Sequence, residues 1–189
     1  FVGVDGSVNA GVVNGTIKAD NLPKTDNVIS IDTAAPKLTG YTVNSLGGTP
    51  VITVAKNYLN AGDSVEIAVA FDEAVTISGD STVTLNNNKK AVYTGTSDDK
   101  KTLYYTYTVS GGDDKTDLGI AANIYPNNIQ DIAGNTLSAG LADAMTLKHD
   151  SRNIEIDTVC VAPTLDGISA GNIYNAAKKV TLSGEPGAV

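Results

Sequence analysis

The segment SVEIAVAF, residues 64–71, alternates apolar side chains with small or polar ones along its whole length. Successive side chains of a β-strand point to opposite faces, so one face of this segment carries only large apolar groups. The segment TLYYTYTV, residues 102–109, shows the same alternation. We therefore predict two long strands, each with one buried face. Their predicted core residues are Val65, Ile67, Val69 and Phe71, followed by Leu103, Tyr105, Tyr107 and Val109.

Shorter strand-like runs surround these two segments. They are VITVA (51–55), AVTI (74–77), TVTL (82–85) and AVYT (91–94). Residues typical of turns separate the runs, in NAGD (60–63), SGD (78–80), NNNKK (86–90) and SGGDD (110–114). The one segment with a plausible helical pattern is LSAGLADAM, residues 137–145. Many short strands between regular turns predict an all-β fold, a β-sandwich.

The phrase Ile-Asp-Thr occurs twice, in IDTAAPKLTG (31–40) and in IDTVCVAPTLDG (156–167). Each copy is followed by a proline, Pro36 or Pro163, which fixes its own φ and favours extended geometry in the preceding residue. We interpret the phrase as a short, stiff joint between domains of a tandem array. Residues 1–32 would then be the C-terminal part of a preceding domain, 33–157 one complete domain, and 158–189 the start of a following domain.

Composition excludes several classes of function. The formal net charge is −8 and the sequence pI is about 4.4, and Arg152 is the only arginine among 13 basic residues. This balance disfavours binding to nucleic acid. No apolar run reaches the roughly 20 residues needed to cross a bilayer, so we predict no membrane span in this segment. Cys160 is the only cysteine, which excludes an intramolecular disulfide and leaves open whether it is free or joins two chains.

Five longer phrases carry a family resemblance. They are YLNAGDSVEIAVAFDEAVTISG (58–79), VTLNNNKKAVYTG (83–95), LYYTYTVSGGDDKTDLGI (103–120), NNIQDIAGNTL (127–137) and IEIDTVCVAPTL (154–165). In order and spacing they resemble the bacterial Ig-like repeats of very large surface proteins, including cyanobacterial motility-associated and adhesin-type proteins. Asp72 stands where that repeat usually has serine, and the second joint carries an insertion that contains Cys160. The resemblance implies an Ig-like β-sandwich, a tandem repeat array with one complete central domain, and a location on a bacterial or archaeal cell surface.

The sequence predicts that the chain is not an enzyme. His149 is the only histidine, and no G-x-S-x-G motif accompanies it as a hydrolase would require. Adjacent carboxylates occur at 72–73, 98–99 and 113–114. Neighbours in a strand point to opposite faces, which does not suit a glycosidase, and pairs in turns are typically solvated. We therefore assign the pair at 98–99 no function.

Acidic side chains near the joints are candidate calcium ligands, because Ca²⁺ binds several oxygen atoms in flexible geometry. The linker with Asp32 meets one end of the sandwich, and strand 64–71 would return to that end and bring Asp72 and Glu73 there. In a Greek-key sandwich the loop before the last strand shares this end, which adds Asp131 and Asn135 of the phrase DIAGN. By repetition, Asp157 would serve the next joint. The resemblance also implies calcium at domain junctions, whereas the alternative is that these residues only form Asx-turns and caps.

These observations predict a structural spacer segment of a large modular extracellular protein, such as an adhesin stalk, a surface fibre or a surface-layer component. Its partners would be neighbouring Ig-like domains of the same protein, or neighbouring chains in a fibre or layer. Two alternatives stay open. One is a subunit of a head-to-tail filament completed by strand exchange. The other is an Ig-like module in which loops such as 86–90 or 110–117 bind carbohydrate or protein. A sugar-binding platform of Tyr93, Tyr104, Tyr105 and Tyr107 is disfavoured, because alternation places Tyr105 and Tyr107 in the core and Tyr104 on the opposite face.

Overall fold

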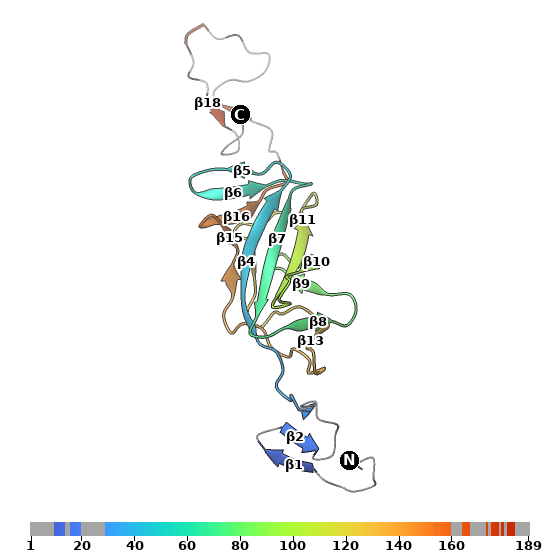
Figure 1. Cartoon of the computed structure of the whole chain (residues 1–189). Coiled ribbons are helices and arrows are strands. Elements are labelled where there is room, and N and C mark those ends of the chain that lie inside the picture. Colours follow the sequence, from blue (N-terminus) through green and yellow to red (C-terminus); the bar gives the residue numbers. More distant parts are fainter. Residues whose placement is uncertain are drawn as a thin grey trace.

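The computed structural model of the chain describes residues 10–13, 16–19, 29–159, 164–166, 173, 175–177, 179 and 181–183. These described residues form strands and turns and no helix (Figure 1), so the chain is all-β as predicted. The strands are β1 (Ala10–Val13), β2 (Thr16–Ala19), β3 (Ile29–Ser30), β4 (Leu38–Gly47), β5 (Val51–Ile52), β6 (Lys56–Leu59), β7 (Ser64–Phe71), β8 (Val75–Ile77), β9 (Thr82–Thr84), β10 (Lys90–Thr96), β11 (Thr102–Thr108), β12 (Gly119–Ile120), β13 (Ile129–Asp131), β14 (Met145–Thr146), β15 (Lys148–His149), β16 (Arg152–Ile156), β17 (Thr164–Asp166) and β18 (Thr181–Ser183).

One layer of the central body is an antiparallel five-stranded sheet in the order β4-β7-β11-β10-β9. Its long central strands, β7 and β11, are the two that alternation predicted. Every second residue of each strand is buried, and the eight predicted core residues all lie in the hydrophobic core. Ile67 of β7 stands opposite Tyr105 of β11 and Val43 of β4, so the buried face continues across three strands.

The opposing elements are shorter. They comprise the pairs β13–β8 and β12–β14 and a four-stranded sheet in the order β15-β16-β6-β5. Within that sheet β6 and β16 are parallel, with Asn57 opposite Ile154 and Leu59 opposite Ile156. The ammonium of Lys56 also donates a hydrogen bond to the carboxylate of Glu155 across this pair. An early strand of the domain is thereby fastened to its last strand.

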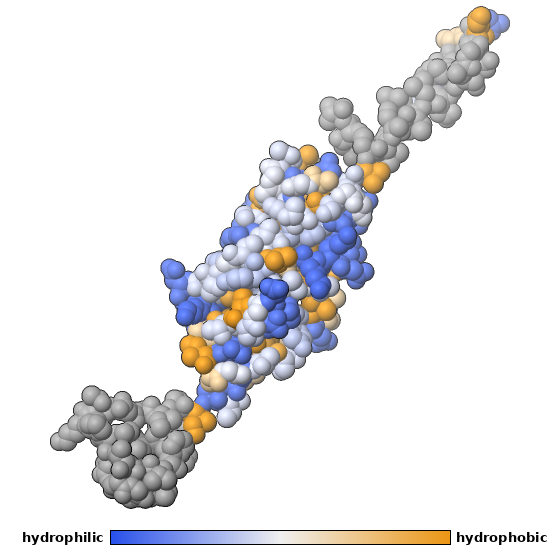
Figure 2. Space-filling view, turned by 90° about the vertical axis from the view of Figure 1, so that its right-hand side faces the viewer, coloured by the Kyte–Doolittle hydropathy of each residue, from blue (hydrophilic) through white to orange (hydrophobic). Residues whose placement is uncertain are grey.

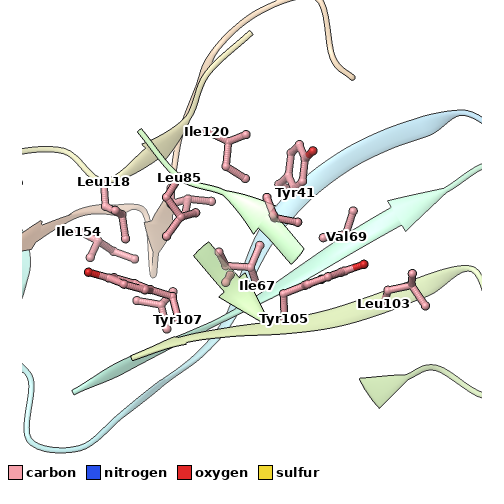
Figure 3. Packing of buried hydrophobic residues seen from close by; sticks show 14 of the residues in the cluster. Tyr41, Ile67, Val69, Leu85, Leu103, Tyr105, Tyr107, Leu118, Ile120 and Ile154 are labelled. Atoms are coloured by element: carbon pink, nitrogen blue, oxygen red, sulfur yellow. The ribbon is translucent and has the colours of Figure 1, made fainter. Parts of the chain in front are cut away.

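The hydrophobic core lies between these elements. Figure 3 shows Leu118, Ile120 and Ile154 facing Tyr105 and Tyr107 across the interior. The curled antiparallel sheets and the shared core are consistent with a β-sandwich. Every residue of the core cluster lies between Leu38 and Ile156, within the predicted central domain. Among the residues that the structure describes, the core of the central body is thus made by residues 38–156 alone.

Two local expectations were wrong. The run 51–55 is not one strand, because Thr53 closes a turn after β5. Its hydroxyl donates to the carbonyl oxygen of Lys56 at 2.9 Å and accepts from the N–H of Lys56 at 3.0 Å. Residues 137–145 are irregular up to the start of β14 rather than helical. Leu137 is held there by a backbone hydrogen bond from its N–H to the carbonyl of Ile129, at 2.9 Å.

The chain meets the central body at one end and leaves it at the other (Figure 1). The proximal end is where residues 31–37 lead into β4, close to Phe71 at the end of β7. The distal end is where residues 157–159 follow β16, and the start of β7 lies on this side. With eight residues in β7 and a rise of about 3.3 Å per residue, the two ends lie roughly 25 Å apart.

Strands outside the central body pair among themselves. β1, β2 and β3 form one antiparallel sheet, and β17 pairs with β18. Cys160 and Pro163 of the second joint lie outside the described residues. None of the described residues belongs to a helix long and apolar enough to cross a membrane.

Candidate metal site at the interdomain joints

Three carboxylates that are distant in the sequence meet at the proximal end. Asp32 lies in the linker, Glu73 in the turn after β7, and Asp131 at the end of β13. One carboxylate oxygen of each lies within 4.8 Å of the others. Oxygens that share one Ca²⁺ lie about 2.3–2.6 Å from the ion, and so up to roughly 5 Å from one another. The spacing therefore fits a calcium ion, and oxygen is the donor that calcium prefers.

Asp131 is the buried member of this acidic triad, and the DIAGN turn fixes its orientation. The backbone N–H of Asn135 donates to Asp131 Oδ1 at 2.8 Å, and Asn135 Nδ2 donates to Asp131 Oδ2 at 2.7 Å. The same amide nitrogen donates to the carbonyl oxygen of Asp32 at 3.1 Å. Asn135 thus joins the linker to the turn that presents Asp131.

Asp131 reaches this end by a different route from the one expected. The sequence argument placed DIAGN in the loop before the last strand, but β14 and β15 intervene between it and β16. Instead, β13 pairs with β8, the strand that directly follows Glu73, with Asp131 opposite Val75. This pairing brings the two carboxylates to the same end of the domain.

Electrostatics within the triad oppose full ionisation of Glu73. Partial burial raises the pKa of Glu73, and the nearby carboxylates of Asp32, Asp131 and Asp72 raise it further. Burial opposes ionisation of Asp131 too, but hydrogen bonds from Asn135 and from backbone N–H groups of the turn outweigh it and lower the pKa of Asp131. The site therefore holds negative charge that a bound cation would stabilise.

The other two candidate ligands lie outside the triad. Asp72 is next to Glu73, but its Oδ1 accepts a hydrogen bond from the N–H of Lys37 at 2.8 Å. Its own N–H donates to the carbonyl of Lys37 at 3.1 Å, so Asp72 fastens the linker to the domain. Asp157 lies at the distal end, where its backbone N–H donates to the carbonyl of Leu59 at 3.0 Å.

Both copies of Ile-Asp-Thr contain the same local hydrogen bond. Asp32 Oδ1 accepts from the N–H of Ala34 at 3.0 Å, and Asp157 Oδ1 accepts from the N–H of Val159 at 3.3 Å. These are Asx-turns, in which a carboxylate bonds the backbone two residues on. One oxygen of each aspartate carboxylate therefore serves an Asx-turn, as the alternative explanation predicted. Asp32 is in addition a member of the acidic triad.

The distal joint has a binding residue that sequence reasoning missed. Asp114 Oδ1 accepts hydrogen bonds from both the N–H and the hydroxyl of Thr158, each at 2.7 Å. Thr158 Oγ1 in turn accepts from the N–H of Gly112 at 2.8 Å. The hydrogen bond from the Thr158 hydroxyl, followed by that from its N–H, lowers the pKa of Asp114. No spacing rule links Asp114 to Thr158, because only the pairing of strands brings them together.

The neighbouring Asp113 was also assigned to a solvated turn, and this was wrong. Its side chain is 2% exposed. Asp113 Oδ2 accepts hydrogen bonds from the Tyr107 hydroxyl at 2.8 Å and from the N–H of Ser110 at 2.9 Å. Lys89 Nζ lies 2.7 Å from Asp113 Oδ1. Asp113 is therefore a paired charge beneath the distal end, and its role is structural.

The tyrosines that could have formed a sugar-binding platform are mostly in the core. Tyr105 and Tyr107 are buried, as alternation predicted, and Tyr104 is only half-buried on the other face of β11. Figure 2 shows hydrophobic residues on its visible face as small separate patches among hydrophilic ones. His149 lies on β15, with Nδ1 3.5 Å from Asp150 Oδ2. Comparisons of the chain with protein-family models, with curated proteins and with solved structures find no match.

Proposed function

We propose that the chain is a structural spacer segment of a large modular protein on a bacterial or archaeal cell surface, with Ig-like sandwiches joined in tandem through Ile-Asp-Thr. The observation that carries this proposal is the placement of the two joints. The chain enters and leaves the central domain at opposite ends, through the same phrase in the same Asx-turn. A domain with this geometry adds its own length to the chain and transmits tension from one end to the other.

The connections at each end suit such a load. Tension on the linker reaches β4, a ten-residue strand paired along its length with β7. It also pulls on the two hydrogen bonds between Lys37 and Asp72, one of which uses the Asp72 carboxylate. Because β4 starts at the proximal end, the force acts along the strand and loads its hydrogen bonds together. At the distal end the force passes through Asp157 and Thr158, which are both fastened to the domain.

Single-molecule force spectroscopy tests the spacer function. In a Cys160→Ser background, Ile31→Cys and Val159→Cys attach the pulling handles at the two ends. As the control, Lys90→Cys and Thr108→Cys attach them to neighbouring ends of β10 and β11, where tension opens the pair one residue at a time. Forced unfolding is governed by the unfolding rate, so we expect a higher rupture force for the end-to-end geometry. Equal or lower end-to-end force would contradict a load-bearing role.

We propose that Ca²⁺ bound by Asp32, Glu73 and Asp131 stiffens the proximal joint. Support comes from the three converging carboxylate oxygens and from their origin in two different parts of the chain, the linker and the domain. An ion bound to all three would tie the linker to the domain in addition to Asn135 and Asp72. Its effect would be to reduce bending where the domain meets the preceding segment.

Thermal melts in EGTA and in about 1 mM Ca²⁺ test this ion. For a dissociation constant of order 10⁻⁴ M, binding to the folded state raises the midpoint by about 5 °C. Glu73→Gln is expected to abolish that rise. In EGTA the same variant should melt no lower than the wild type, since a raised pKa in the folded state means that ionised Glu73 is destabilising as the pH rises through that pKa.

The matched control for this melt is Asp143→Asn, which changes an exposed carboxylate outside the triad. It should keep the full calcium response. A wild-type midpoint that is identical with and without Ca²⁺ would contradict the proposed ion, and the joint would then depend on hydrogen bonds and on buried Pro36 alone.

The strand-exchange alternative receives less support. The described strands of both flanks pair within their own segments, β1 to β3 in one and β17 with β18 in the other. This pairing lies within single segments of the chain, whereas the alternative requires strands of the flanks to pair with a neighbouring chain. If the chain formed polymers in sedimentation experiments, the filament-subunit function would be favoured instead.

A further inference from the structure

The central domain holds both joints of this chain, one at each of its ends. At the first joint, the phrase Ile31-Asp32-Thr33 is fastened to the domain that follows it. At the second joint, the phrase Ile156-Asp157-Thr158 is fastened to the domain that precedes it. The central domain therefore displays both halves of the arrangement that a single joint between two such domains would have.

The atoms used in the two halves do not overlap. Towards the preceding domain, the phrase uses the N–H of the aspartate and the N–H and hydroxyl of the threonine, which bond Leu59, Asp114 and Gly112. Towards the following domain, it uses the carbonyl oxygen of the aspartate, which accepts from Asn135, and the aspartate carboxylate, which lies near those of Glu73 and Asp131.

The local conformation is also shared. In both copies the aspartate Oδ1 accepts a hydrogen bond from the N–H two residues later. Because an Asx-turn fixes the direction of the backbone after the aspartate, one turn presents both sets of atoms at the same time. Neither set of contacts requires the phrase to give up the other.

Exposure of the isoleucine supports the same conclusion. Ile156 is 2% exposed, because β16 places it in the core of the domain that precedes its joint. Ile31 holds the same place in the first phrase and is 51% exposed. In the proposed array, a domain before the first joint would bury Ile31 as the central domain buries Ile156.

We propose that one Ile-Asp-Thr phrase is a two-sided clasp that binds the domain before it and the domain after it simultaneously. The partner of each distal end is thus the proximal end of a second domain of the same kind, and no flexible residue separates the two sets of contacts. This inference rests on the proposed tandem spacer and specifies the surfaces through which its domains meet: Asp114 and Gly112 on one side, Asn135 and the triad on the other.

The test uses a fusion that the repeated phrase makes seamless. Residues 31–158 are followed directly by residues 34–159, so that Asp157 and Thr158 serve both copies of the domain. Each copy contains the whole core cluster and can fold on its own. The fusion has no cysteine, since Cys160 lies beyond it, and Lys90→Cys in each copy provides an exposed site for a spin label. Distances between the labels are measured in EDTA, so that the result does not depend on calcium.

We expect a narrow distance distribution for the unmodified fusion. Asp114→Ala in the first copy alone and Asn135→Ala in the second copy alone should each broaden it by on the order of 10 Å, the spread of a flexible linker of about four residues. Asp143→Ala in the first copy is the control and should leave the width unchanged. Thermal melts of each variant show that both copies remain folded.

Two results would overturn the clasp. One is an unmodified fusion as broad as its variants, and the other is broadening by only one of the two substitutions. Neither result would affect the rupture forces of the single domain, so the spacer function and the clasp fail separately. A fusion that is rigid while the single domain ruptures at low force would instead contradict the load-bearing role and leave the clasp in place.

Discussion

Replacing Tyr105 with alanine is expected to lower the free energy of unfolding of the central domain by about 3–5 kcal/mol, the usual cost of removing a buried aromatic ring. Tyr105 is fully buried at the centre of β11, and its ring packs edge-on against Tyr93 with centroids 5.9 Å apart. Its hydroxyl lies 2.8 Å from Ser81 Oγ. The truncation would leave a cavity between the layers and an unpaired position beside Ser81. Chemical denaturation monitored by circular dichroism measures the loss.

Two further substitutions separate the contributions to this loss. Tyr105→Phe keeps the ring and should cost only about 1 kcal/mol, the net value of one hydrogen bond. Ser81 Oγ still donates to the carbonyl oxygen of Asn127 at 2.7 Å in that variant. Tyr104→Ala removes the neighbouring ring on the other face and should cost far less than Tyr105→Ala. Equal losses at Tyr104 and Tyr105 would show that the alternation does not define the core.

Asp113→Ala is expected to destabilise the domain by about 1–3 kcal/mol, the cost of leaving buried hydrogen-bond donors without their acceptor, while the half-exposed Lys89 stays solvated. The carboxylate is the acceptor for the Tyr107 hydroxyl and for the N–H of Ser110, and it lies against the ammonium of Lys89. Without it the buried Tyr107 hydroxyl keeps only the contact with Asn87 Nδ2, at 3.1 Å. Urea denaturation at neutral pH provides the measurement.

The Asp113 carboxylate also makes the stability of the domain depend on pH in the acidic range. The hydrogen bond from Lys89 lowers the pKa of Asp113, with smaller contributions from Ser110 and Tyr107, and together these outweigh burial. A lowered pKa in the folded state gives stability that is present above the ordinary aspartate pKa and is lost as the pH falls below about 4. Asp113→Asn should flatten this acid limb, whereas Asp98→Asn, in an exposed turn, should leave it unchanged. An unchanged acid limb in Asp113→Asn would contradict the assignment.

Alternation predicts the long strands because it reports burial directly. In β7 and β11 the core side chains recur at every second position, and the eight residues inferred from this pattern are all in the core. A short segment has too few residues for alternation to show whether it is a strand or a turn. The run 51–55 contains three aliphatic side chains, yet the hydroxyl of Thr53 closes a turn within it. Such a turn depends on the hydrogen bonds of one side-chain hydroxyl, and the spacing of apolar residues carries no information about them.

The repeated phrase Ile-Asp-Thr forms an Asx-turn in both copies, while its interpretation as a joint between domains stays a prediction. The convergence of Asp32, Glu73 and Asp131 followed from topology, although Asp131 arrives through pairing of β13 with β8. Asp113 and Asp114 could not be assigned in this way. They are adjacent in a turn, but one is buried beneath Tyr107 and the other binds Thr158 of the joint. Their roles arise from contacts across long stretches of sequence.

The parallel pair of β6 and β16 also governs the order in which a growing chain can fold. Residues 56–59 pair with residues 153–156, so the domain cannot complete its second layer until its last strand has been synthesised. In the tandem array that we propose, the next residues to leave the ribosome are those of the joint, before any long strand of a following domain. Domains of a tandem protein fold as units from the N-terminus, and pairing between similar neighbours is a characteristic error. In such an array, β6 of each domain would already be paired with β16 when similar strands of the next domain are synthesised.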